Sequence, residues 1–145
     1  TVSLRLETDL PDILTDSGRL EQVFINLLLN ARDAIEEKEQ MHVYGQSAET
    51  PIQKQIELRS RSENGAVVVE VEDTGPGIPE AVREKIFEPF FTTKEVGEGT
   101  GLGLSISYGI IKDCGGTIQA VDGGSGGACF VMRFPALEAE PCETL

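Results

Sequence analysis

The stretch QVFINLLLNARDAI, residues 22–35, lies within a segment whose apolar residues repeat with the period of an α-helix. This pattern runs from about residue 17 to residue 39, and Thr15-Asp16-Ser17 before it offers N-cap chemistry. A second, polar stripe fills a band of roughly 80° on the predicted helix, yet apolar residues border it on both edges. Such a stripe is not a simple solvated face. It consists of Gln22, Asn26, Asn30 and Asp33, with Ile25 and Leu29 along its outer edge.

Two interpretations of this stripe remain open. Asparagine is a mediocre helix former, so its repetition inside a helix needs a reason. The amides of Asn26 and Asn30 either bond to a neighbouring sheet or loop, or present carbonyl oxygens to a ligand. Oxygen ligands of this kind suit a hard divalent cation or the water around it.

Strand patterns and turn signals occupy most of the remaining chain. Asn64-Gly65 between two apolar runs is a strong hairpin signal, and Gly115-Gly116 ends a second helical pattern. Helices and hairpin-connected strands, without repeated βαβ units, predict an α+β fold with helices on one face of a sheet. We expect strands at 2–6, 54–61, 66–73, 117–121 and 128–134, helices at 17–39, 79–86 and 102–114, and loops at 40–53 and 88–101.

Composition restricts the possible classes of protein. With 145 residues, 39% of them hydrophobic, the chain is about one domain, expected to span 1–135 before an acidic, frayed tail at 136–145. A net charge of −13 argues against nucleic acid and membrane surfaces as partners. Three scattered cysteines form neither a disulfide framework nor a zinc pair, so a cytoplasmic setting is expected. The chain has no initiator Met, signal peptide or long apolar run, which favours a piece of a larger parent whose membrane anchor, if it has one, would lie outside this sequence.

The motif DTGPGI, residues 73–78, follows a predicted strand. Asp73 lies where that strand leaves the sheet, beside Gly75 and Gly77, which permit close backbone approach or a positive φ. A carboxylate there can accept a hydrogen bond from an exocyclic amine such as adenine N6. An ordinary glycine-containing turn is the alternative.

Glycines are concentrated in GEGTGLGLSI, residues 97–106, which leads into the predicted helix at 102. This spacing fits neither the Walker loop nor GxGxxG. Unpaired N–H groups at a helix N-terminus nevertheless bind phosphate oxygens well, and Lys94 upstream can supply a cation. Phe87, Phe90 and Phe91 are expected to pack at the root of this loop. A flexible loop with a solvated lysine is the alternative interpretation.

The order of these motifs resembles the ATP-binding domain of sensor histidine kinases. NxxxN on a long helix, DxGxG after a strand, FxPFFTTK, and GxGTGLGLS opening a helix correspond to the N, G1, F and G2 boxes of the GHKL superfamily. The match runs from about Asp16 to Pro135, and the wording FFTTK and GTGLGLSI is similar to nitrogen-regulation kinases. The resemblance implies a two-layer α/β sandwich of the Bergerat type: a mixed, mostly antiparallel sheet under about three helices.

The resemblance also implies roles for individual residues. Asn30 would coordinate Mg²⁺ that bridges the phosphates of ATP, with Asn26 nearby, and Asp73 would bind adenine N6. Residues 88–101 would form the ATP lid, with Lys94 contacting the phosphates. Asn26, Asn30 and Lys94 would be catalytic. The implied nucleotide-binding set is Asn26, Asn30, Asp33, Asp73, Gly75, Gly77, Ile78, Lys94, Gly99, Thr100, Gly101, Leu102, Gly103 and Leu104.

Position 26 separates the branches of this superfamily. Hydrolytic relatives carry a glutamate there that activates water, whereas Asn26 is an amide that cannot act as a general base at neutral pH. This difference favours a kinase over an ATPase. The rival interpretations are a GHKL-type ATPase or protein-serine kinase, and an ATP-binding adaptor without catalysis.

Two features depart from the family pattern. The last strand has Ala128-Cys129-Phe130 where relatives usually place a hydroxyl residue near the base. The phosphoacceptor histidine belongs to a dimerisation hairpin in the family, and His42 in its polar loop is not expected to replace it. The implied partners are that hairpin of the parent kinase and, through it, a response regulator. We expect the isolated domain to be monomeric, to bind nucleotide and not to autophosphorylate, and the parent to be a homodimer.

Overall fold

The computed structural model describes residues 1–44, 53–91, 103–124 and 126–137. A sheet of five strands, in the order β1-β2-β3-β5-β4, forms one layer. β1 pairs with β2 in parallel, and every other neighbouring pair is antiparallel. The elements are β1 (Val2–Leu6), α1 (Ser17–Tyr44), β2 (Ile56–Glu63), β3 (Ala66–Asp73), the 3-10 turns η1 (Glu80–Val82) and η2 (Lys85–Phe87), α2 (Gly103–Asp113), β4 (Thr117–Asp122) and β5 (Ala128–Pro135).

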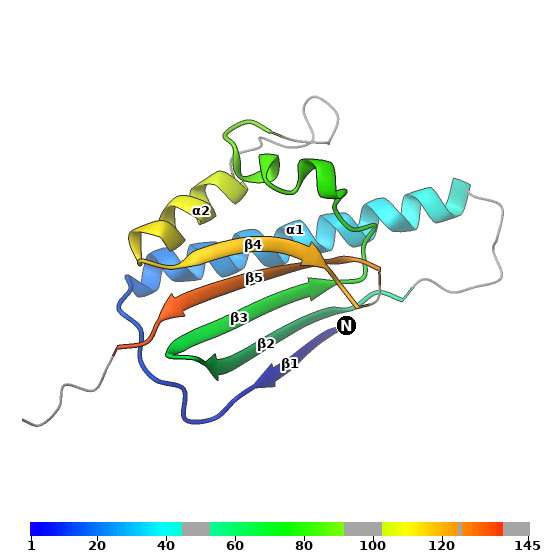
Figure 1. Ribbon diagram of the computed structural model, residues 1–145. Coiled ribbons are helices and arrows are strands. Elements are labelled where there is room, and N and C mark those ends of the chain that lie inside the picture. Colours follow the sequence, from blue (N-terminus) through cyan, green and yellow to red (C-terminus); the bar gives the residue numbers. More distant parts are fainter. Residues whose placement is uncertain (45–52, 92–102, 125, 138–145) are drawn as a thin grey trace, which may run out of the picture.

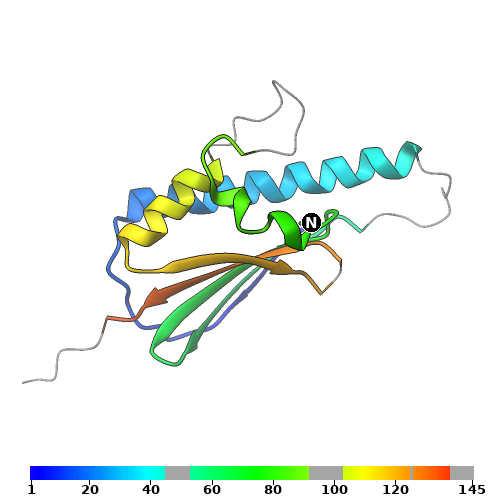
Figure 2. The same ribbon diagram turned by 45° about the horizontal axis from the view of Figure 1, so that its top comes forward.

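The helices form a second layer on one face of this sheet (Figures 1 and 2). Alternate residues of β3 and β5 face this layer and meet the apolar side of α1, because successive strand side chains point to opposite faces. Val23 and Leu27 of α1 are fully buried there. The core between the layers also contains Val67, Val69, Val71, Ile110, Ile111, Ile118, Phe130, Met132 and Phe134. The predicted α+β sandwich is confirmed.

The Asn64-Gly65 turn forms as predicted. Both residues have positive φ, +50° and +76°, which is the requirement of a type I′ hairpin turn. The two strands pair in register from Glu63 opposite Ala66 to Ile56 opposite Asp73. This hairpin carries Asp73 to the end of the sheet where the candidate site lies.

Three local expectations were wrong. The first helix continues past residue 39 to Tyr44, because no glycine or proline occurs between residue 39 and Gly45. The predicted helix at 79–86 is instead the two short turns η1 and η2. Phe90 does not pack at the loop root: it is 72% exposed and has a φ of +65°, whereas Phe87 contacts Tyr108 and Phe130.

The chain stays hydrogen-bonded to the rest of the fold just after β5. Ala136 and Leu137 donate backbone hydrogen bonds to Gly65 and Asp12, so ordered pairing continues two residues beyond Pro135, and residues 138–145 lie outside the described part. β1 is an edge strand whose helix-side residues Val2, Leu4 and Leu6 are 54–62% exposed, since the helical layer does not reach it. Among the described helices, none combines the length and the apolarity that crossing a bilayer requires.

The sheet face away from the helices carries an arginine–glutamate cluster over a few buried apolar residues. Arg59 lies at its centre, 2.9 Å from Glu70 and 3.5 Å from Glu72. Burial pushes the pKa of Glu70 up, but hydrogen bonds from Arg61 and Arg59 outweigh it and hold that pKa below its usual value. We call this surface the charged face; its members are Glu57, Arg59, Arg61, Glu63, Glu70, Glu72 and Arg133, and Val68, Cys129 and Val131 lie buried beneath them.

Candidate functional site

Asp73 is a buried carboxylate with one oxygen satisfied and one open. Its side chain is 2% exposed at the end of β3. Oδ1 accepts the backbone N–H groups of Gly75 at 2.8 Å and Ala128 at 3.3 Å. Within the described part of the chain, no group donates to Oδ2. Burial raises the pKa of Asp73, and the two backbone hydrogen bonds only partly offset this. The site therefore holds an acceptor for a donor that comes from outside the chain.

Gly75 and Gly77 are required by the surroundings of this carboxylate. A Cβ on Gly75 would lie 2.8 Å from the Cβ of Ala34 and 2.9 Å from Asp73 Oδ1. Gly77 has a φ of +81°, and a Cβ there would lie 3.0 Å from the carbonyl oxygen of Gly126. The loop thus passes between α1 and the β4–β5 turn with no room for a side chain at either glycine. The expected close backbone approach is confirmed at both glycines.

Thr74 anchors the same loop from the other side. Its side chain is 5% exposed and faces the start of β2. The hydroxyl donates to Gln53 O at 2.6 Å and accepts from Gln55 N at 3.0 Å. Ile78 is partly buried against the core at the end of the motif. Sequence reasoning did not assign Thr74 a role, and its buried hydroxyl fixes the position of the neighbouring Asp73.

The asparagine stripe divides into two parts. Asn26 Nδ2 donates to Gly103 O at 3.3 Å and to Ser107 Oγ at 3.2 Å, and Asn26 Oδ1 accepts from Gln22 at 3.0 Å. Asn26 therefore ties α1 to the first turn of α2. The half-buried amide of Asn30 makes no such bond within the described part of the chain. Asn26 thus bonds to a neighbouring segment, the first of the two interpretations of the stripe. Asn30 remains a candidate for presenting its oxygen to a ligand, the second interpretation.

The predicted residues converge along α1. Asn30 lies one helical turn from Asn26, which contacts the start of α2, and one turn from Ala34, which contacts Gly75. Asp33, one turn beyond Asn30 on the same side, is half-buried and accepts from Arg32 at 3.2 Å. Asn30 therefore stands between the Asp73 loop and the N-terminus of α2.

The start of α2 is the described part of the phosphate cradle predicted from sequence. α2 begins at Gly103, where a Cβ would meet nothing within 4 Å, and Leu104 packs partly against the core. A glycine at 103 is therefore not required by its described neighbours. Lys94, Gly99, Thr100, Gly101 and Leu102 lie outside the described residues.

Two residues besides Thr74 also had no predicted role in the site. Ser107 is fully buried and donates to Gly103 O at 2.9 Å, which reinforces the bond from Asn26. Gly127 lies against Asp73 so closely that a Cβ would be 1.9 Å from the Asp73 carbonyl oxygen. The position of Ser107 one turn after Gly103 was the available signal for the first residue. No local signal marked the second among so many glycines.

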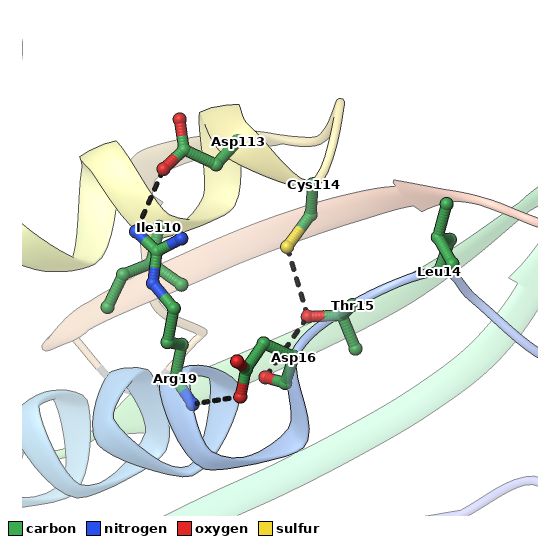
Figure 3. Close-up of a pocket in the computed structure, with 7 residues that line it drawn as sticks. All are labelled: Leu14, Thr15, Asp16, Arg19, Ile110, Asp113 and Cys114. Carbon is green, nitrogen blue, oxygen red and sulfur yellow. Dashed lines mark hydrogen bonds and ion pairs between the residues drawn. The ribbon is translucent and has the colours of Figure 1, made fainter.

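A separate cavity of about 390 Å³ lies between the N-terminal end of α1 and the C-terminal end of α2 (Figure 3). None of the predicted site residues lines it. Thr15 Oγ1 and Cys114 Sγ are 3.0 Å apart in it, and Arg19 spans to Asp113 at 2.8 Å (Figure 3). Leu14, Asp16 and Ile110 complete its lining. Because Arg19 already pairs with a carboxylate and Asp16 caps α1, the cavity has no polar group that identifies a ligand.

The two described cysteines are expected to differ strongly in reactivity. Cys129 is 3% exposed beneath Arg59, and burial raises its pKa to about 11, so roughly one thiol in a thousand is ionised at pH 8. Cys114 is half-buried at the cavity wall. Iodoacetamide should therefore label Cys114 and leave Cys129 unlabelled, as peptide mass spectrometry would measure. Cys129 should react once the domain is unfolded; equal labelling of both in the native domain would contradict the burial described here.

Comparison with known proteins gives a family for this arrangement. The family described as "Histidine kinase-, DNA gyrase B-, and HSP90-like ATPase" matches residues 15–138. The chain belongs to this family. Among its members, the sensor kinase CckA of Brucella abortus is 48% identical over 91% of this chain and 14% of its own length. The two-component sensor PprA of Pseudomonas aeruginosa is 44% identical over 88% of this chain and 13% of its own length. The chain thus spans about one seventh of these relatives.

Solved structures of this family agree with the fold. The catalytic domain of histidine kinase ThkA in a nucleotide-free form superposes with a TM-score of 0.72 at 35% identity, covering 93% of this chain and 78% of that one. Full-length ShkA in complex with AMPPNP has the same TM-score at 29% identity, covering 93% of this chain and 25% of that one. The structure of ThkA in complex with the response regulator TrrA has a TM-score of 0.68 at 32% identity, covering 93% of this chain and 34% of that one. The chain is thus a kinase catalytic domain of the sensor histidine kinase type.

Proposed function

We propose that this domain binds Mg-ATP and presents its γ-phosphate to a histidine on a separate phosphoacceptor hairpin of the parent kinase. Asp73 carries the proposal: this carboxylate is 2% exposed, and one of its oxygens accepts no hydrogen bond within the described part of the chain. The exocyclic amine of adenine is a donor that fits this acceptor. Guanine would instead place a carbonyl oxygen there, and leaving such buried groups unpaired costs about 1–3 kcal/mol.

The residues present also fit a nucleotide-bound Mg²⁺. Among the described residues, no group of three or more acidic, histidine or cysteine side chains could hold a metal ion. Mg²⁺ keeps several waters and is commonly held through substrate phosphates with few protein ligands. One amide ligand, that of Asn30, which makes no hydrogen bond within the described part of the chain, is compatible with such a site. Bound there, the ion would neutralise phosphate charge. The N-terminus of α2, fixed by Asn26 and Ser107, would hold phosphate oxygens through its N–H groups. Lys94 and the amides of Gly101 and Leu102 would complete this cradle.

The absence of a base at position 26 supports transfer over hydrolysis. Asn26 donates hydrogen bonds to Gly103 O and Ser107 Oγ of α2, so its amide positions α2 and does not activate water. The remaining chemistry is positioning and charge neutralisation, which dominate phosphoryl transfer elsewhere. The partners we propose are a histidine-bearing hairpin and, through it, a response regulator; the ThkA structure with a response regulator supports the second.

Mg-ATP is expected to stabilise the domain against heat. At a concentration about 100 times the Kd, linkage adds about 2.7 kcal/mol, or about 8 °C in Tm for a domain of this size. Differential scanning calorimetry with Mg-ATP, Mg-ADP and ATP plus chelator measures this shift. In Asn30→Ala the dependence on Mg²⁺ should disappear and a smaller, Mg²⁺-independent shift should remain. An unchanged wild-type Tm in saturating Mg-ATP would overturn the nucleotide assignment.

Transfer itself is tested with the parent's hairpin supplied in trans. Radiolabelled ATP, this domain and the hairpin should give acid-labile, alkali-stable phosphate on the hairpin. Rapid release of free phosphate without a hairpin would favour an ATPase, and ATP binding without transfer to the hairpin would favour an adaptor.

A further inference from the structure

The glycine-rich turn between β4 and β5 forms one wall against Asp73. It closes on itself through Gly123 N to Gly127 O at 2.8 Å and Gly126 N to Gly123 O at 3.2 Å. Immediately after it, Ala128 N donates to Asp73 Oδ1 at 3.3 Å. The position of this turn therefore sets one of the two hydrogen bonds that orient the Asp73 carboxylate.

Glu72 holds this turn from the charged face. Its Oε1 accepts the backbone N–H of Gly124 at 3.0 Å, and its Cγ lies 3.2 Å from where a Cβ of Gly123 would stand. Its other oxygen lies 3.5 Å from Arg59, which also binds Glu70 at 2.9 Å. The side chain of Glu72 is 18% exposed: its contact with Arg59 is partly buried, and its bond with Gly124 lies at the surface. Glu72 thus joins the charged face to the turn.

A second contact fastens the turn from the helix side. Arg83 donates to Ile78 O at 3.2 Å and forms an ion pair with Asp122, the last residue of β4. Arg83 therefore links the segment that follows Asp73 to the end of β4. The Gly124 contact is the one that acts on the turn itself, since Asp122 belongs to the strand before it.

We propose that Glu72 is a positioning residue for base recognition. By holding Gly124 it keeps the turn in place, and the turn presents the Ala128 amide to Oδ1 of Asp73, leaving Oδ2 aimed at the ligand. This inference rests on the proposed function, in which Asp73 accepts the exocyclic amine of adenine. Glu72 itself does not touch the base, because its side chain lies on the opposite face of the sheet.

The test compares Glu72→Ala with Glu63→Ala, which removes another carboxylate of the charged face away from the turn. We expect Glu72→Ala to weaken Mg-ATP binding about fivefold in isothermal titration calorimetry, since the charge-assisted bond at Asp73 is misaligned but not lost. The affinity for purine riboside triphosphate, which lacks the exocyclic amine, should fall less than about twofold in Glu72→Ala. Glu63→Ala should bind both nucleotides as wild type does. Glu72→Gln keeps an acceptor for Gly124 and should restore most of the ATP affinity.

Amide hydrogen exchange provides a readout without nucleotide. In the ligand-free domain, Ala128 N–H should exchange about tenfold faster in Glu72→Ala than in Glu63→Ala. An unchanged exchange rate, or equal losses of affinity for both nucleotides, would overturn the positioning role. If wild type bound neither nucleotide, the proposed function would fail, while the exchange rates would still decide whether Glu72 positions Ala128.

Discussion

Asp73→Asn is expected to weaken Mg-ATP binding about 100-fold. The asparagine oxygen can keep the backbone hydrogen bonds from Gly75 and Ala128, which turns the side-chain NH₂ toward the ligand. That group and the amine of adenine are both donors, so a charge-assisted bond is replaced by an unfavourable pair. Titration calorimetry of wild type and variant measures the loss.

Asp113→Asn is the matched control, because it also removes one carboxylate but lies at the distant cavity beside Arg19. Its nucleotide affinity should equal that of wild type. An Asp73→Asn domain that bound Mg-ATP as tightly as wild type would show that Asp73 does not read the base.

Asp73→Asn should not lower the unfolding free energy of the ligand-free domain at neutral pH. Burial raises the pKa of Asp73, so the folded state disfavours its ionised form. The stability that the protonated group contributes is complete below the unfolded pKa and is lost as pH rises through the folded pKa. Relative to Asp73→Asn, wild type should therefore gain unfolding free energy as pH falls from about 7 towards about 4, which urea denaturation at each pH measures.

Gly127→Ala is expected to lower the unfolding free energy by about 3 kcal/mol, or about 9 °C in Tm. The new Cβ would meet the Asp73 carbonyl oxygen at 1.9 Å and its carbonyl carbon at 2.7 Å. Backbone atoms cannot rotate away as a flexible side chain can, so the start of β5 must separate from the end of β3. Calorimetry of the ligand-free domain measures the change.

Gly124→Ala is the control within the same turn. Its nearest neighbour would be Glu72 Oε1 at 4.0 Å, and the N–H that Glu72 accepts is retained. We expect a change within about 0.5 kcal/mol. Equal effects of the two substitutions would contradict the tight packing at Gly127.

Sequence reasoning succeeded where structure is local. The Asn64-Gly65 turn, the apolar period of α1 and the end of α2 just before Gly115 each depend on a few consecutive residues. The order of motifs also brought Asp73, Gly75 and Asn30 into one predicted site. Asp73 and Gly75 contact each other in the structure, and Asn30 lies nearby on α1.

What the sequence did not reveal depends on contacts between distant segments. Ala128 and Asp73 are 55 residues apart, and Asn26 and Ser107 are 81 apart, so no local pattern announces either bond. The glycines at 123–127 read as turn formers, although only Gly127 is pressed against the Asp73 backbone. Glu72 and Gly124 are likewise 52 residues apart, so no local pattern marks their contact.

The parallel pairing of β1 imposes an order on folding. Thr1 and Lys54 are hydrogen-bonded although 53 residues separate them, and the whole of α1 lies between. β2 and β3, by contrast, are joined by a two-residue turn and can pair early, because closing a short loop loses less chain entropy. During synthesis β1 therefore emerges before β2, its partner in the described sheet. It pairs later than the β2–β3 hairpin forms.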